Sequence, residues 1–159
     1  MPTDRFKLIA SVYVLFVRDG KILMLRRANT GYMDGHYSLV AGHADGNEAL
    51  TAATAREAKE EAGVVIAPAN LRLKLTMHRR ADDERLDFFF EPAAWTGEPQ
   101  NMEPDKCDDS PLVPARRPAR EHHSLHPRGA PLLSGSRGVQ RVGVGELNRY
   151  LHCQKGRLN

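Results

Sequence analysis

The sequence lacks the segments that characterise membrane and secreted proteins. Its 159 residues contain no run of eighteen consecutive apolar residues, which excludes a conventional transmembrane helix. The N-terminus lacks the basic, apolar and small-residue order of a secretory signal peptide. The two cysteines, Cys107 and Cys153, have neither a metal-binding spacing nor the pattern of a disulfide framework. We therefore expect one domain with its own core, located in the cytoplasm and without a membrane partner.

Several large apolar residue types are absent from the last third of the chain. Residues 110–159 contain no Phe, Trp, Ile or Met, but five Pro, six Gly and four His. They carry nine Lys and Arg against two acidic residues, net +7, whereas residues 1–109 carry fourteen against eighteen, net −4. Such a segment buries too little apolar surface to offset the entropy lost on ordering it. We expect residues 1–109 to form the folded domain and residues 110–159 to be a disordered or loosely packed basic tail.

The genetic code offers an explanation for this tail. With free choice among synonymous codons, residues 110–127 read one nucleotide later can give Leu-Arg-Trp-Phe-Pro-Leu, followed by Asp-Ala-Leu-Pro. Our hypothesis is a frameshift near Asp109, which resequencing the gene would refute by finding no single-base discrepancy. A basic arm that binds RNA is the other interpretation. It is disfavoured because the tail lacks the interleaved aromatic residues on which unpaired bases stack.

The most strongly patterned stretch runs from Gly42 to Val64 and has the sequence GHADGNEALTAATAREAKEEAGV. Its fixed points are Gly42, Glu48, Arg56-Glu57, Glu60-Glu61 and Gly63-Val64. Asn47 is a good N-cap before a run of helix-forming residues, and Gly63 supplies the left-handed residue that ends a helix. The pattern predicts a helix of about four turns.

Three carboxylates share one face of this predicted helix. Glu57, Glu60 and Glu61 are spaced i, i+3, i+4, which places neighbouring Cβ atoms roughly 5–6 Å apart. Because like charges repel at that distance, a cation should compensate them. Clustered carboxylate oxygens suit Mg²⁺, which bridges protein carboxylates to substrate phosphates. A solvated acidic face would explain the three glutamates alone, but the glycines, Glu48 and Arg56 in register favour a metal site.

The whole pattern resembles the Nudix box, the signature of hydrolases that cut a nucleoside diphosphate linked to another group. The resemblance covers about two thirds of the chain. It implies an α/β fold, a Nudix-type α/β/α sandwich in which a mixed sheet lies between the box helix and a C-terminal helix. Because the sequence changes character after Asp109, we expect the last strand and that second helix to be missing or disordered. One sheet face would then be poorly covered, which predicts low stability or self-association, such as a homodimer.

The resemblance also implies roles for individual residues. Glu57, Glu60 and Glu61 would bind the metal and activate water, with Glu57 or Glu60 as the base. Arg56 would orient these carboxylates through charge-assisted hydrogen bonds. A backbone carbonyl of Gly42, or of its predecessor Ala41, would join the metal ligands.

Candidates outside the helix are less closely specified. Arg26 and Arg27 end a predicted strand, where they would contact substrate phosphates or remain solvated. Many Nudix enzymes place one further metal-binding glutamate in a later loop, and Glu103 is the candidate here, with Glu98 in reserve. Glu48 either pairs with an arginine or joins the metal ligands.

Hydrophobic period and turn residues predict the remaining elements. Strands are expected at residues 6–17, 22–25, 36–41, 71–78 and 86–95, with a hairpin turn at residues 18–21. The three consecutive phenylalanines at residues 88–90 are candidates for the core.

Together these features predict Mg²⁺-dependent hydrolysis of a phosphoanhydride in a small nucleotide, with Mn²⁺ as a substitute ion. Canonical or oxidised nucleoside triphosphates are the first expected substrates because the chain is short. Nucleotide sugars and dinucleoside polyphosphates remain open. The alternative is a catalytically inactive protein of the same fold that binds nucleotides or has a regulatory role.

Overall fold

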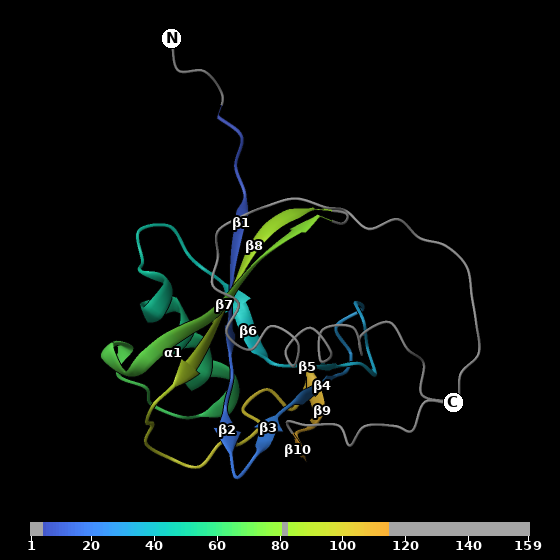
Figure 1. The fold of residues 1–159 in the computed structure, drawn as a ribbon. Coiled ribbons are helices and arrows are strands. Elements are labelled where there is room, and N and C mark those ends of the chain that lie inside the picture. Colours follow the sequence, from blue (N-terminus) through green and yellow to red (C-terminus); the bar gives the residue numbers. More distant parts are fainter. Residues whose placement is uncertain (1–4, 81–82, 115–159) are drawn as a thin grey trace, which may run out of the picture.

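A mixed four-stranded sheet forms the centre of the computed structural model, which describes residues 5–80 and 83–114 (Figure 1). Its strand order is β6-β1-β8-β7. The strands are β1 (Ile9–Val14), β6 (Val40–His43), β7 (Leu71–Arg80) and β8 (Glu84–Pro92). β1 runs antiparallel to β6 and parallel to β8, and β7 runs antiparallel to β8. No helix among the described residues is long and apolar enough to cross a membrane.

Two small sheets lie beside the main one. The first, in the order β10-β3-β2, contains β2 (Val17–Arg18), β3 (Lys21–Leu23) and β10 (Leu112–Pro114). The second, in the order β5-β4-β9, contains β4 (Leu25–Arg27), β5 (Tyr37–Ser38) and β9 (Cys107–Asp109). The strand predicted at residues 6–17 is therefore divided between β1 and β2, and the predicted hairpin turn joins β2 to β3.

The described chain continues as a strand beyond the predicted domain boundary at Asp109. In β10, Leu112 pairs with Leu23 and Val113 with Ile22 of β3. Residues 112–114 therefore add to the edge of a small sheet, because this short apolar segment can pair with β3, and the domain boundary at Asp109 stays a prediction. The tail and frameshift predictions for residues 115–159, including the missing second helix, lie outside the described residues.

The helix of the patterned stretch is α1 (Leu50–Ala62), followed by a short 3₁₀ turn, η1 (Pro68–Asn70). Gly63 ends α1 as predicted, at a φ of +68°, and its N–H donates to the Lys59 carbonyl at 3.1 Å. The predicted N-cap is wrong. Asn47 lies in a turn before the helix at a φ of +67°, and the N-cap position belongs to Ala49, which makes no side-chain capping bond.

α1 covers one face of the main sheet (Figure 1). This face contains the larger apolar core. Three alanines of α1, namely Ala53, Ala58 and Ala62, are fully buried in it. Its other buried members are Val12, Val14, Phe16, Leu23, Leu25, Val40, Val64, Ile66, Leu71, Phe90 and Cys107. Because alanine side chains are small, the helix packs with little volume between its backbone and the strands.

A smaller core lies on the opposite face of the sheet. Its buried members are Leu15, Ile22, Met24, Leu39 and Phe89. Phe89 stacks on Tyr13 with ring centroids 4.5 Å apart. Because side chains alternate along β8, Phe88 and Phe90 pack on the α1 side instead. The prediction that the three phenylalanines belong to the core is confirmed.

Candidate active site

Arg56 on α1 connects the glutamates of the patterned stretch. Its Nη1 donates to Glu57 Oε1 at 2.7 Å and to Glu60 Oε2 at 3.2 Å. Its Nη2 donates to Glu48 Oε1 at 2.9 Å and to the His43 carbonyl at 3.0 Å. Hydrogen bonding to Glu48 raises the pKa of Arg56 above its ordinary value. The guanidinium therefore fixes three carboxylates and the end of β6 around one permanent positive charge.

Glu57 lies against the backbone of Gly42. A Cβ atom at Gly42 would stand 2.0 Å from Glu57 Cδ, so only glycine leaves room for this carboxylate. Glu57 is 8% exposed, and this burial raises the pKa of its carboxyl although Arg56 acts in the opposite direction. The close approach explains why a glycine must precede the helix at this distance in sequence.

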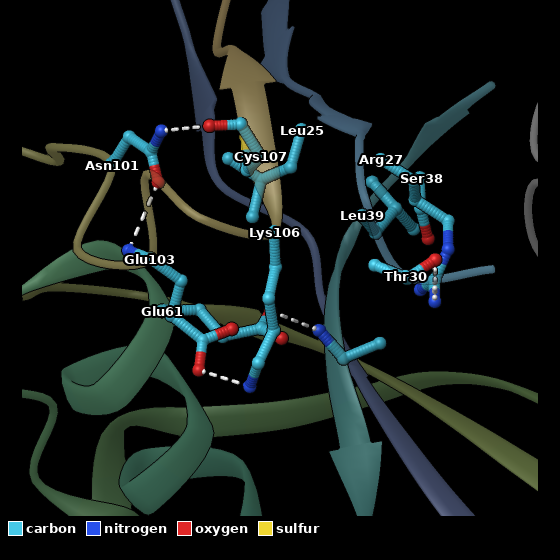
Figure 2. Close-up of a pocket in the computed structure, with 11 residues that line it drawn as sticks. Leu25, Arg27, Thr30, Ser38, Leu39, Glu61, Asn101, Glu103, Lys106 and Cys107 are labelled. Carbon is cyan, nitrogen blue, oxygen red and sulfur yellow. Dashed lines mark hydrogen bonds and ion pairs between the residues drawn. The ribbon is translucent and has the colours of Figure 1, made fainter. Parts of the chain in front are cut away.

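Glu61 faces a cavity of about 230 Å³ beside β6 (Figure 2). Its Oε2 accepts the Ala41 N–H at 3.0 Å, and burial raises the pKa of its carboxyl to about 7. Glu103 lines the same cavity and binds Lys106 Nζ at 2.7 Å. The remaining lining residues are Leu25, Arg27, Thr30, Ser38, Leu39, Ala41, Asn101, Lys106 and Cys107. The structure thus brings Glu103 to the box helix.

Glu103 and Glu98, the two loop candidates for a further metal ligand, lie in different surroundings. Two hydrogen bonds, from Gln100 N to Ala62 O at 3.0 Å and from Met102 N to Glu61 O at 3.1 Å, attach the loop to the end of α1. They direct Glu103 toward Glu61. Glu98 instead pairs with Arg18 at 2.7 Å on the surface, where its side chain is 73% exposed.

The two strand-end arginines point to different places. Arg27 lines the cavity of Glu61 and also a second cavity of about 270 Å³. Its Nε donates to the Tyr32 carbonyl at 2.9 Å. Arg26 lines neither cavity, because it forms a bidentate pair with Asp108 on β9 at 2.7 and 2.8 Å. Of the two, only Arg27 stands beside the glutamates.

The second cavity opens on the face of the sheet opposite α1. It shares Arg27, Ser38 and Ala41 with the first cavity and reaches Gly42. Its other lining residues are Ser11, Tyr13, Tyr32, Met33, His36, Tyr37, His43, Arg79 and Arg85. Three tyrosines and three arginines give it flat apolar surfaces and positive charge. Because the second cavity adjoins the first, which Glu61 lines, a ligand in the second cavity can extend toward the glutamates of α1.

The sequence did not single out the buried polar groups beneath this cavity. Ser11 on β1 is 3% exposed and Asp87 on β8 is 1% exposed, and the two are partners across these parallel strands. Asp87 Oδ2 accepts the Arg79 Nε–H at 3.0 Å. Ser11 Oγ and Asp87 Oδ1 are buried without a hydrogen-bond partner. A polar residue inside each of the two apolar strand sequences was the available signal.

The donor set suits a hard divalent cation. The described residues contain no group of three His, Cys, Asp or Glu side chains already placed to hold a metal ion. Glu57 and Glu60 are turned toward Arg56, and Glu61 toward the Ala41 N–H. All three offer carboxylate oxygens, and the glycine at residue 42 keeps the backbone open beside them. This oxygen chemistry matches Mg²⁺ or Mn²⁺ rather than a soft metal.

Comparison with known families agrees with this arrangement. A family model described as the NUDIX domain matches residues 6–133. The chain belongs to this family. The predicted Nudix-type fold with its mixed sheet and the assignment as a Nudix hydrolase are thereby confirmed. No curated protein matches the sequence significantly.

Several solved structures share the fold at low sequence identity. A MutT NUDIX hydrolase from Burkholderia pseudomallei is 23% identical with a TM-score of 0.63, over 74% of this chain and 92% of that one. A MutT protein from Methanosarcina mazei Go1 is 20% identical with a TM-score of 0.58, over 68% and 78%. An ADP compounds hydrolase is 18% identical with a TM-score of 0.54, over 71% and 58%.

Proposed function

We propose that this Nudix protein hydrolyses a phosphoanhydride bond of nucleoside triphosphates, using Mg²⁺ or Mn²⁺ held by Glu57, Glu60 and Glu61. The observation that carries the proposal is the placement of the Glu57 carboxylate against Gly42, with Arg56 behind it. Bound to these oxygens, the ion would neutralise the diphosphate and lower the pKa of a water molecule. Glu103 is the additional ligand, because it shares a cavity with Glu61.

The protein groups supply positioning and a proton acceptor. Arg56 orients Glu57 and Glu60 through its Nη1 and balances part of their charge. Glu57 or Glu60 accepts the proton of the attacking water. The fixed position of Glu57 between Gly42 and Arg56 favours it for this role, and in the metal-free chain burial raises the pKa of its carboxyl. Exposure favours Glu60, whose side chain is 55% exposed and open to water.

Arg27 supports the assignment of a nucleotide substrate. It stands between the two cavities, where its guanidinium can bind a phosphate next to the glutamates. The nucleoside then extends into the second cavity, against Tyr13 and Tyr37. The described relatives include MutT hydrolases and a hydrolase of ADP compounds, which also points to nucleotides.

Replacement of Glu60 by Gln tests the proposal. The change removes one charge and keeps the shape, and we expect turnover to fall at least about 100-fold, the size of a proton-transfer contribution. Phosphate and pyrophosphate release would be measured with Mg²⁺ on nucleoside triphosphates, oxidised nucleotides and nucleotide sugars.

Glu98→Gln is the matched control, because that glutamate pairs with Arg18 on the surface. It should retain wild-type turnover. Turnover of Glu60→Gln within threefold of wild type would contradict the proposed role. If the wild-type chain bound nucleotides but released nothing from any of them, a nucleotide-binding protein would be the better description.

A further inference from the structure

We propose that Lys106 is an internal counter-ion of Glu103, which a divalent cation displaces and which then binds a phosphate group of the substrate. This inference rests on the proposed function and adds a residue to it. Lys106 Nζ donates to Glu103 Oε1 at 2.7 Å, and both residues line the cavity that Glu61 faces. Figure 2 shows the lysine side chain extending along the cavity to the Glu103 carboxylate. A monovalent ammonium therefore lies beside two of the proposed metal ligands.

Backbone hydrogen bonds hold Lys106 in this position. The N–H groups of Lys106 and Cys107 both donate to the Glu103 carbonyl at 2.9 Å, so a single tight turn separates the lysine from the glutamate. Asn101 closes this turn, because its Oδ1 accepts the Glu103 N–H at 3.0 Å and its Nδ2 donates to the Cys107 carbonyl at 2.6 Å. The Lys106 carbonyl accepts the Ala28 N–H at 2.8 Å, directly after β4. The backbone of Lys106 is thus attached on two sides, and its side chain provides the movement.

The exposure of the ion pair suits it to exchange. The Lys106 side chain is 63% exposed and the Glu103 side chain is 32% exposed. Ion pairs in contact with water contribute little stability, whereas a divalent cation binds carboxylate oxygens with twice the charge of an ammonium. Because the two cations repel each other, an ion bound by Glu61 and Glu103 displaces the ammonium. Removal of the ammonium should therefore strengthen metal binding.

The displaced ammonium finds an anion in the same cavity. Arg27 also lines this cavity, and its guanidinium is the proposed contact for a substrate phosphate. The flexible four-carbon stem of a lysine lets Nζ turn from Glu103 to a neighbouring phosphate without a change in the backbone, and an ammonium binds phosphate as a point charge. Lys106 thus couples the two binding events, since an ion at Glu103 frees the ammonium for the phosphate.

Replacement of Lys106 by Gln should move two affinities in opposite directions. Calorimetry with Mn²⁺ alone on the full chain should show about two- to fivefold tighter binding in Lys106→Gln, the size of one partly exposed ion pair. With saturating Mg²⁺, α,β-methylene-ADP, which contains no phosphoanhydride bond, should bind about tenfold more weakly, the effect of one hydrogen bond to a charged group. A residue that only stabilised the loop would weaken both affinities when replaced.

Lys59→Gln is the matched control, because Lys59 is an exposed lysine on the helix of the glutamates and lines neither cavity. It removes the same charge and should leave both affinities unchanged. A second test uses Glu103→Gln as the background. There Lys106→Gln should no longer strengthen Mn²⁺ binding, because the ammonium has no carboxylate to occupy. Circular dichroism would check folding, and Lys106→Met provides a second variant that keeps most of the stem.

An unchanged or weaker Mn²⁺ affinity in Lys106→Gln would overturn the inference. Equal gains in Lys106→Gln and Lys59→Gln would also overturn it, because they would show a general effect of charge. Tighter Mn²⁺ binding with unchanged affinity for α,β-methylene-ADP would overturn the transfer of the ammonium to phosphate. Absence of Mn²⁺ binding by the wild type would overturn the inference together with the proposed metal site. Opposite shifts in a chain that hydrolyses no nucleotide would support the inference and contradict only the proposed hydrolysis.

Discussion

The two faces of the main sheet use the same strands for different purposes. Under α1, fourteen buried residues form a large apolar cluster, and the buried polar residues of the helix are Thr54 and Glu57. On the opposite face, a cluster of five buried apolar residues lies beside Ser11, Asp87 and the arginines of the second cavity. Side chains alternate between the two faces along β8. Phe88 and Phe90 therefore pack on the α1 side. Asp87 and Phe89 lie on the opposite face.

This difference indicates which substitutions should change the preference among nucleotides and which should change the stability of the protein. The proposed catalytic carboxylates come from α1, whose inner side faces the larger core, and β6 carries their backbone partners at the sheet edge. The second cavity, the proposed place of the nucleoside, lies on the other side of the sheet and is lined by no residue of α1. Substitutions on the helix side should therefore change stability or turnover, and substitutions on the cavity side should change which nucleotide binds.

The largest effect is expected from truncation of Phe90. Phe90→Ala removes a 5% exposed ring from the core under α1 and should reduce the free energy of unfolding by about 3–5 kcal/mol. Urea denaturation would measure it. Any folded fraction should keep the wild-type preference among nucleotides.

Phe89→Ala is the matched change on the other face. It should also destabilise the protein, but it removes the ring on which Tyr13 stacks and should alter the relative affinities for nucleotides. If both variants kept the wild-type preference, the assignment of recognition to the cavity face would be wrong.

Next in size is the effect of a single methyl group at Gly42. In Gly42→Ala the new Cβ would stand 2.0 Å from Glu57 Cδ, which must move away. We expect kcat/KM to fall about 100-fold, since a displacement of about 1 Å can cost that much in a catalytic group. Gly46→Ala is the control, because no atom lies within 4 Å of its added Cβ. Comparable losses in both variants would show that the effect is not specific to Glu57.

Much of this arrangement could be predicted from local sequence. The helix, its end at Gly63 and the shared face of the glutamates follow from composition and from the 3.6-residue period. The predicted N-cap failed because Asn47 adopts a left-handed turn, in which the neighbouring Glu48 carboxylate accepts the Asp45 N–H at 2.6 Å. Spacing also could not rank the glutamates, whose exposure depends on the strands they pack against.

The parts that were missed depend on contacts between distant residues. Ser11 and Asp87 meet because β1 and β8 are parallel neighbours, although they are far apart in the chain. The sequence named Glu103 ahead of Glu98, but the position of Glu103 beside Glu61 depends on how residues 100 and 102 bond to the end of α1. Neither the period of a strand nor the composition of a loop encodes such tertiary pairings.

A moderate pH effect should come from Glu61. Its carboxyl pKa is raised to about 7 in the folded chain by burial, against 4.5 ordinarily. The folded state therefore binds this proton more tightly than the unfolded state. The resulting contribution to the free energy of unfolding is fully present below pH 4.5 and is lost as pH rises through 7. Without divalent metal, thermal unfolding should occur at lower temperature at pH 8.5 than at pH 6. Glu61→Gln should flatten this dependence, and an unchanged slope would assign it to other groups.

The smallest effect separates the two strand-end arginines. Arg27 lines both cavities, so Arg27→Gln should raise KM for the best nucleotide about tenfold, the loss of one charged hydrogen bond to phosphate. Arg26→Gln should change KM less than threefold, because Arg26 faces Asp108 on β9. Steady-state kinetics with Mg²⁺ would measure both variants. If Arg26→Gln raised KM as much as Arg27→Gln, positive charge at the strand end would act over a distance. The division between Arg27 at the cavities and Arg26 paired with β9 would then not hold.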